Sequence, residues 1–150
     1  MTIAEAKKKI EHYCAYQERC HKEVVEKLTS FGMLSQARDH IMTHLIQENY
    51  LNEERFAKSF ARGKFRTKKW GKNRIVNELK YRNISRFNIQ SALKEISESE
   101  YLTTLDALAK KRLGEIKETH PLKVKRKLAD YLLYRGWESD LVYQKIKELV

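Results

Sequence analysis

The sequence contains very few residues that make turns, with one proline and five glycines among 150 residues. Tight β-hairpins depend on glycine, on asparagine–glycine pairs and on proline, so their scarcity argues against a chain of short strands. Leucine, lysine, glutamate, arginine and alanine, which helices tolerate best, are well represented instead. We therefore predict an all-α fold.

Long apolar segments are also missing. No stretch approaches the roughly 18 apolar residues needed to cross a bilayer, and the first residues, MTIAEAKKKIEHY, contain no apolar signal segment. We expect no membrane partner and no secretion, and hence a cytoplasmic protein.

Residues that carry catalysis or bind metals are sparse. The two cysteines, Cys14 and Cys20, are too few for a disulfide framework. Together with His12 and His21 they lack the spacing of a zinc site. The glycines are isolated, so no phosphate-cradling loop is present. We predict no enzyme activity, no cofactor and no metal.

Acidic residues are nearly absent from one stretch. Between Arg55 and Arg82 there are eleven lysines and arginines and a single acid, Glu78, which gives 11 − 1 = +10 of the net charge of +11. A solvated helix face is the ordinary explanation of a charge run, but here the acids that would offset self-repulsion are missing. This concentration of charge favours a polyanion as the partner.

Apolar residues at helical spacing predict nine helices. They are expected from Ile3 to about Glu18, from His21 to Phe31, from a cap at Ser35, from Asn52 to a frayed end between Gly63 and Lys69, from Lys72 to Arg82, from a cap at Ser85, from Ser97 or Ser99, from Pro121, and from Ser139. Trp70 and Gly71 mark a break between two of these helices. Gly32, Asn83 and Gly136 stand where a left-handed residue ends a helix.

The middle helices reveal an internal repeat. Three sets of residues align, namely Val24, Val25, Leu28, Gly32 and Ser35, then Ile75, Val76, Leu79, Asn83 and Ser85, and then Leu128, Ala129, Leu132, Gly136 and Ser139. The spacing of 51 and then 53 residues between the aligned leucines is typical of a repeat protein. We predict three tandem three-helix repeats, 1–49, 50–97 and 98–150, in an elongated, slightly curved array. The chain is expected to be a monomer.

Several segments resemble the RecX family of regulatory proteins. They are Leu51-Asn52-Glu53-Glu54-Arg55-Phe56-Ala57, Trp70-Gly71-Lys72-Asn73-Arg74-Ile75 with Glu78-Leu79, Arg19 to Leu28, and Leu132-Leu133-Tyr134-Arg135-Gly136-Trp137. The resemblance covers essentially the whole chain, although the family more often has Asp at position 52 and Gly at position 83. It implies a non-enzymatic modulator of the RecA recombinase that lies in the groove of the RecA filament on DNA and inhibits strand exchange and ATP hydrolysis.

The cations around the break between helices are the expected contacts with the filament or with DNA, and weak direct binding to DNA is left open as a second interaction. The predicted site comprises Arg62, Lys64, Arg66, Lys68, Lys69, Trp70, Lys72, Arg74 and Arg82. Trp70 is left open between stacking on a base or partner and packing inward, whereas Trp137 is predicted to be core. The alternative function is a helix-turn-helix DNA-binding regulator. It fits less well because the third helix of each repeat carries few cations.

Overall fold

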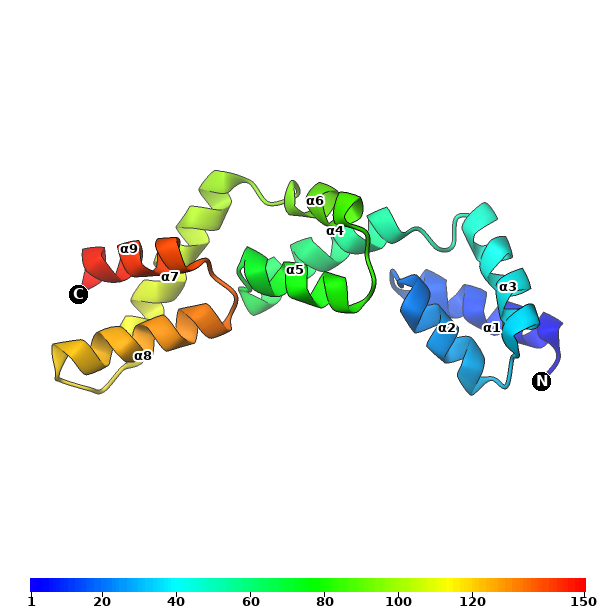
Figure 1. Cartoon of the computed structure of the whole chain (residues 1–150), viewed down its shortest axis with the longest axis horizontal. Coiled ribbons are helices and arrows are strands. Elements are labelled where there is room, and N and C mark those ends of the chain that lie inside the picture. Colours follow the sequence, from blue (N-terminus) through cyan, green and yellow to red (C-terminus); the bar gives the residue numbers. More distant parts are fainter. The chain divides into compact units, whose positions relative to one another are not determined.

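The computed structural model describes all residues, 1–150, and contains nine α-helices, one π-helical turn and no strand, which confirms the all-α prediction (Figure 1). The elements are α1 (Ile3–Tyr16), α2 (His21–Ser30), α3 (Ser35–Gln47), α4 (Glu53–Gly63), η1 (Lys64–Lys68), α5 (Lys72–Tyr81), α6 (Arg86–Leu93), α7 (Glu98–Glu115), α8 (Pro121–Tyr134) and α9 (Ser139–Leu149). None of these helices is long and apolar enough to span a membrane.

Most helix starts follow the local chemistry of the sequence. The Asn52 side chain accepts a hydrogen bond from the Arg55 amide at 2.9 Å, and the hydroxyl of Ser85 accepts from the Asn88 amide at 3.1 Å. Ser97, rather than Ser99, caps α7. These side chains supply acceptors for amides that have no partner within the first turn of a helix.

The predicted cap at Ser35 is wrong. Leu34, with φ −80° and ψ 168°, is the extended residue that enters α3, and no side chain accepts a hydrogen bond from its first turn. Ser35 already lies inside the helix. Its hydroxyl is therefore one residue too late to cap it.

The three middle helices end in the same way. Gly32, Asn83 and Gly136 have φ values of +79°, +59° and +94°, which confirms the left-handed positions. The next residue is buried in each case, and its amide donates to the carbonyl of the aligned leucine at 3.1 to 3.2 Å. The last of these buried residues is Trp137, which is 1% exposed and confirms its predicted place in the core.

Contacts along the chain group its residues into two compact units. The first contains residues 1–59 and 79–91, and the second contains residues 60–78 and 92–150. The division therefore passes through α4, α5 and α6. The three-repeat division at 49/50 and 97/98 stays a prediction.

In the first unit, α1, α2 and α3 pack on one another. Their buried core consists of Ala6, Ile10, Cys14, Val24, Leu28, Met33, Ile41, Leu45 and Leu51. Burial raises the pKa of Cys14 to about 11 and that of Cys20 to about 12. Both thiols are therefore protonated and poorly nucleophilic near neutral pH.

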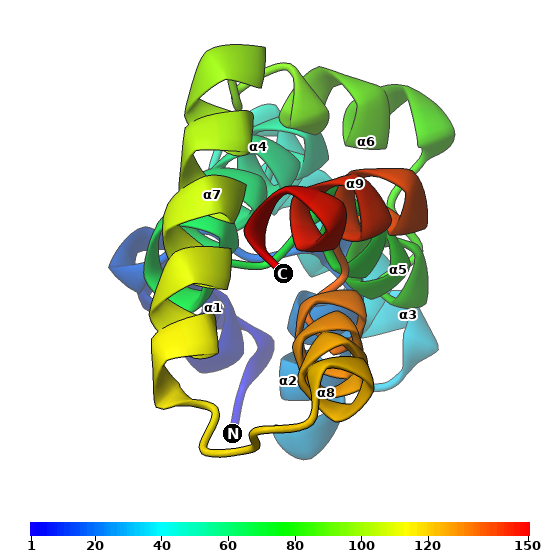
Figure 2. The same cartoon turned by 90° about the vertical axis from the view of Figure 1, so that its left-hand side faces the viewer.

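In the second unit, α7, α8 and α9 pack together, and residues 116–120 connect the end of α7 to the start of α8 (Figure 2). Pro121 is the first residue of α8, as predicted, where its missing N–H is not needed. The buried side chains include Tyr101, Leu105, Leu128, Leu132, Trp137 and Val142. This triplet is the support on which residues 60–78 lie.

Candidate nucleic-acid interface

The helix that begins at Glu53 does not fray where the sequence predicted. Its last residues continue directly into the π-helical turn η1, and the run ends at Lys69, which has a left-handed φ of +57°. The hydroxyl of Thr67 donates to the Gly63 carbonyl at 2.7 Å, and Phe65 is 3% exposed. The wider turn thus buries one aromatic side chain while its neighbours Arg66 and Lys68 stay exposed.

Two glycines let the backbone after this turn lie directly on the end of α8. The Gly71 amide donates to the Arg135 carbonyl at 2.8 Å, and the Asn73 amide donates to the Gly136 carbonyl at 3.0 Å. A Cβ on Gly71 would lie 2.5 Å from the Gly136 carbonyl carbon and oxygen. Glycine at both positions is therefore what permits this close approach.

Side chains of α7 and of the turn after α8 complete the anchoring. The Tyr101 hydroxyl accepts from the Lys72 amide at 2.8 Å and donates to a carboxylate oxygen of Glu138. Burial and the hydrogen bond to Glu138 hold the pKa of Tyr101 well above its usual value. The phenol therefore stays protonated and can donate and accept at once. Because α5 begins after a glycine that has no side chain to cap it, Tyr101 supplies the missing acceptor.

An aromatic cluster lies beneath the anchored segment. The rings of Tyr101 and Trp137 stack with centroids 4.4 Å apart, and Phe65 lies 5.9 and 6.4 Å from them. The indole Nε1 of Trp137 donates to the Lys69 carbonyl at 3.1 Å. Arg135 adds a further bond of 2.6 Å from its guanidinium to the Lys68 carbonyl. Residues 65–73 are thus held by backbone and side-chain bonds to the α7–α9 triplet.

Trp70 is half-buried between cations. The Arg74 guanidinium carbon lies 4.4 Å from the centroid of its indole ring and the Lys64 ammonium 5.2 Å, while Phe60 packs against it at 6.2 Å. Arg74 also lies over the ring of Tyr134 at 5.1 Å and donates to its carbonyl at 3.4 Å. The ring is not a fully buried plug. Its stacking on a base stays a prediction.

The cations of the predicted site differ in their partners. Arg62 forms an ion pair with Glu95 at 2.5 Å, and outside the predicted site Arg55 pairs with Glu18 at 2.8 Å and Lys58 with Glu54 at 3.1 Å. Six others have no carboxylate within ion-pairing distance, namely Lys64, Arg66, Lys68, Lys69, Lys72 and Arg74. We call these six cations the unpaired cationic surface, and because residues 64–74 contain no acid they carry 6 − 0 = +6.

Arg82 does not join the unpaired cationic surface. It belongs to the first unit, where it lines a hollow together with His21, Lys22, Glu53 and Asn83. The other predicted residues, from Arg62 to Arg74, all lie in the second unit. Eight of the nine predicted site residues therefore belong to the second unit, and the ninth, Arg82, belongs to the first.

Three further residues belong to this interface that the charge pattern of the sequence did not predict, namely Tyr101, Tyr134 and Arg135. A signal was present in the repeat, because Tyr81 and Tyr134 both stand two residues after an aligned leucine. In the first unit the Lys22 ammonium lies 3.8 Å from the centroid of the Tyr81 ring and donates to its carbonyl at 3.2 Å, as Arg74 does with Tyr134. The same cation–tyrosine contact is used in both units.

The starts of α2 and α5 resemble each other in a second way, because in both helices the first amide donates to a side chain of a later helix. His21 and Lys72 each stand three residues before an aligned apolar residue, Val24 or Ile75. The His21 amide donates to a carboxylate oxygen of Glu53 at 3.0 Å, just as the Lys72 amide donates to Tyr101. The first two middle helices, α2 and α5, thus each receive an N-terminal acceptor from a helix that follows in the chain.

Replacing Tyr101 by phenylalanine is expected to lower the free energy of unfolding by about 1 to 2 kcal/mol, because the Lys72 amide and the Glu138 carboxylate each lose a partner. Hydrogen exchange of the Lys72 amide should accelerate, and denaturant unfolding gives the free energy. Tyr143→Phe is the matched control, since Tyr143 is 57% exposed. Unchanged exchange at Lys72 in Tyr101→Phe would contradict the assignment.

No group of three or more His, Cys, Asp or Glu side chains in residues 1–150 is arranged to hold a metal ion. The fold and the interface instead define an all-helical protein built of three-helix domains that presents unpaired cations. Two family models match the chain. They are the second three-helix domain of RecX, over residues 52–93, and the third three-helix domain of RecX, over residues 98–146. The chain belongs to the RecX family of regulatory proteins.

Individual relatives agree with this assignment. The regulatory protein RecX of Clostridioides difficile is 26% identical over 145 residues, which are 97% of this chain and 68% of that protein. The RecX of Lactobacillus gasseri is 28% identical over 137 residues, 89% of this chain and 51% of its own length. The chain thus spans between about half and two thirds of the length of these relatives.

Solved structures show the same fold. A crystal structure of RecX from Lactobacillus salivarius has a TM-score of 0.84 and 24% identity, with 98% of this chain and 96% of that chain covered. Another crystal structure of regulatory protein RecX has a TM-score of 0.86 and 23% identity, covering 97% and 73% of the two chains.

Proposed function

We propose that the chain binds the filament that a RecA-type recombinase forms on DNA and inhibits its ATP hydrolysis and strand exchange, thereby modulating DNA repair and recombination. The proposal takes its partner from the resemblance to the RecX family and its contact surface from the structure. In this proposal the chain acts as a cytoplasmic monomer without chemistry of its own. Direct DNA binding is weak beside filament binding.

One observation carries the proposal, namely the unpaired cationic surface itself. Six cations within eleven residues repel one another, and no carboxylate offsets them. Six cations without balancing acids are unfavourable on a surface that faces only solvent. A row of phosphates on a bound partner would neutralise them. Each phosphate that a lysine or arginine neutralises releases a bound counterion, which favours association.

The anchoring of this segment supports the same conclusion. Residues 65–73 are fixed to α7, α8 and the Gly136 turn by the bonds described above, so the cations emerge from a defined backbone. Binding to a partner then has to order only the cationic side chains. The entropic cost of binding is therefore smaller than it would be if the same cations stood on an unanchored loop. A filament groove, with phosphates at its floor and protein at its walls, is a target that such a rigid cationic surface complements.

The test follows ATP hydrolysis by a purified RecA-type recombinase on single-stranded DNA while the purified chain is added. Inhibition at chain concentrations too low to bind DNA alone, measured in parallel without recombinase, is the expected result. Unchanged hydrolysis would overturn the proposal. Tight, sequence-selective binding to duplex DNA without effect on the recombinase would favour the helix-turn-helix alternative.

A further inference from the structure

The end of a middle helix is a contact site in both units. In the second unit the start of α5 lies against the end of α8, where the Arg74 guanidinium donates to the Tyr134 carbonyl at 3.4 Å. In the first unit the start of α2 lies against the end of α5, where the Lys22 ammonium donates to the Tyr81 carbonyl at 3.2 Å. Each of these two middle helices thus begins against the end of the next middle helix in the chain.

The end of the first middle helix, α2, borders an open groove. Leu34 is 79% exposed there, and no atom lies within 4 Å of a Cβ on Gly32. At the equivalent Gly136, by contrast, a Cβ would lie 2.3 Å from the Cβ of Arg74. We call this space the α2-end groove. It measures about 560 Å³ and is lined by Ile3, Gly32, Met33, Leu34, Gln36, Ala37 and His40.

The polar groups that receive a helix start elsewhere are replaced by apolar ones in the α2-end groove. In the first unit the first amide of α2 donates to Glu53, the first residue of α4, whereas the first residue of α1 is Ile3. In the second unit the first amide of α5 donates to Tyr101, whose hydroxyl donates to Glu138, the residue that enters α9. The residue that enters α3 is Leu34. The groove therefore suits a helix start that has no first amide to satisfy.

The start of α8 has this property. Its first residue is Pro121, which has no N–H, and its second residue, Leu122, is 69% exposed. Its third residue is Lys123, and Arg74 is likewise the third residue of α5. A lysine in this place would lie at the carbonyl end of α2, at Ser30, where the helix dipole favours a cation.

We propose that the start of α8 in one copy of the chain docks into the α2-end groove of a second copy. Leu122 then packs against Ile3 and Leu34, and Lys123 lies at the carbonyl end of α2. The two surfaces are complementary because a groove without acceptors meets a helix start without its first donor. The contact joins two different surfaces, so it links copies head to tail.

This contact is too small to hold a dimer by itself. Residues 121–124 cover far less than the roughly 800 Å² per partner that a stable interface buries, so the dilute chain remains a monomer. Copies that bind side by side on one filament are at a high effective concentration, and the contact would then make inhibition cooperative. Only this consequence rests on the proposed function, because the contact itself can be tested without recombinase.

The experiment cross-links introduced cysteines in the free chain at high protein concentration. Leu34→Cys and Leu122→Cys are mixed and treated with a short bismaleimide, while the native Cys14 and Cys20 are buried and react poorly. The mixture should give on the order of tenfold more dimer than either variant alone, because thiols held in contact react at an effective concentration in roughly the millimolar range.

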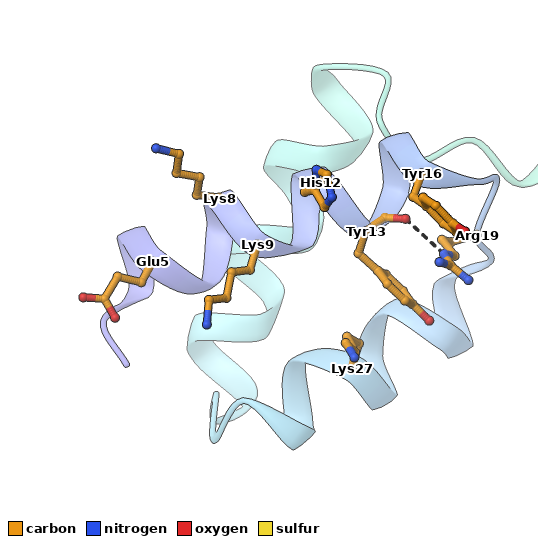
Figure 3. A pocket seen from close by; sticks show the side chains of 8 residues that line it. All are labelled: Glu5, Lys8, Lys9, His12, Tyr13, Tyr16, Arg19 and Lys27. Carbon is orange, nitrogen blue, oxygen red and sulfur yellow. Dashed lines mark hydrogen bonds between the residues drawn. The ribbon is translucent and has the colours of Figure 1, made fainter.

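Two exposed tyrosines provide matched controls. Tyr16 is 78% exposed and lies in the separate groove between α1 and α2 that Figure 3 shows, and Tyr143 is 57% exposed on α9. Tyr16→Cys mixed with Leu122→Cys, and Leu34→Cys mixed with Tyr143→Cys, should give only the background of random collisions. As much dimer in these mixtures, or in Leu34→Cys alone, as in the test mixture would overturn the proposal.

A charge in the groove gives an independent test. Ile3→Glu added to the Leu34→Cys chain should reduce cross-linking with Leu122→Cys to background, because docking would bury an unpaired carboxylate against Leu122. Circular dichroism shows whether this variant keeps its helices and its melting temperature. An undiminished yield of dimer from the folded variant would show that Leu122 does not enter this groove.

Discussion

The substitution Gly136→Ala is expected to lower the free energy of unfolding by on the order of 3 kcal/mol or more. The new Cβ would lie 2.3 Å from the Cβ and 2.4 Å from the amide nitrogen of Arg74, and the φ of +94° disfavours any side chain. Arg74 cannot move away without breaking the bonds of Gly71 and Asn73 to the end of α8. The measurement is unfolding by denaturant, together with hydrogen exchange of the Gly71 and Asn73 amides.

Alanine substitutions at two other glycines separate the cost of the close contact with Arg74 from the cost of the left-handed φ. At Gly32 the φ is +79° but no atom lies within 4 Å of a Cβ, so Gly32→Ala should cost only about 1 kcal/mol for its conformation. At Gly114, inside α7, the space is open and φ is helical, so alanine should stabilise by about 0.5 to 1 kcal/mol. If Gly136→Ala cost no more than Gly32→Ala, the close approach would not constrain the fold.

The charge reversal Arg66→Glu/Lys68→Glu is expected to weaken binding to the recombinase filament by about 100-fold at low salt, if each lost contact is worth about 1 kcal/mol and each new glutamate adds repulsion. The slope of log affinity against log salt should fall by roughly 1.4 to 1.8, that is 0.7 to 0.9 for each of two phosphates. Inhibition of ATP hydrolysis at a fixed chain concentration should fall with the affinity.

Arg66 and Lys68 suit this test because replacing their side chains breaks no interaction within the fold. Both are exposed and neither side chain makes a hydrogen bond or an ion pair. Arg74 and Lys69 are unsuitable, since Arg74 packs on Trp70 and Tyr134 and the Lys69 ammonium donates to the Arg66 carbonyl at 2.8 Å. Lys94→Glu/Lys147→Glu, which makes the same charge change at two exposed lysines outside this surface, is the control. Equal losses in both double variants would show that net charge, and not this surface, determines binding.

Local chemistry predicted most of the helices and their ends. The acceptors at Asn52, Ser85 and Ser97 and the left-handed residues at 32, 83 and 136 act over three or four residues, so the sequence alone reveals them. Ser35 shows the limit of this reasoning. A serine near a helix start is a cap only if it is the extended residue, and here the turn after Gly32 makes Leu34 that residue.

The sequence predicted which segment carries the cations of the interface. It did not predict which residues elsewhere in the chain contact that segment. The pairing of Arg62 with Glu95 joins residues 33 positions apart, and the contact of Arg135 with Lys68 joins residues 67 apart. Periodicity says nothing about such pairs. The π-helical turn was missed for the same reason, because the burial of Phe65 against Tyr101 and Trp137 depends on tertiary packing.

The hydrogen-bond acceptors at the starts of α2 and α5 come from other helices, and this has a consequence for how the chain folds. The amides of His21 and Lys72 find their acceptors on Glu53 and Tyr101, which belong to later helices. While the helices that carry Glu53 and Tyr101 are unfolded, the first amides of α2 and α5 lack these acceptors, so folding of successive helix triplets is coupled between nearest neighbours. A fragment that ended before Glu53 would keep all residues of α2 and still leave its first amide without an acceptor.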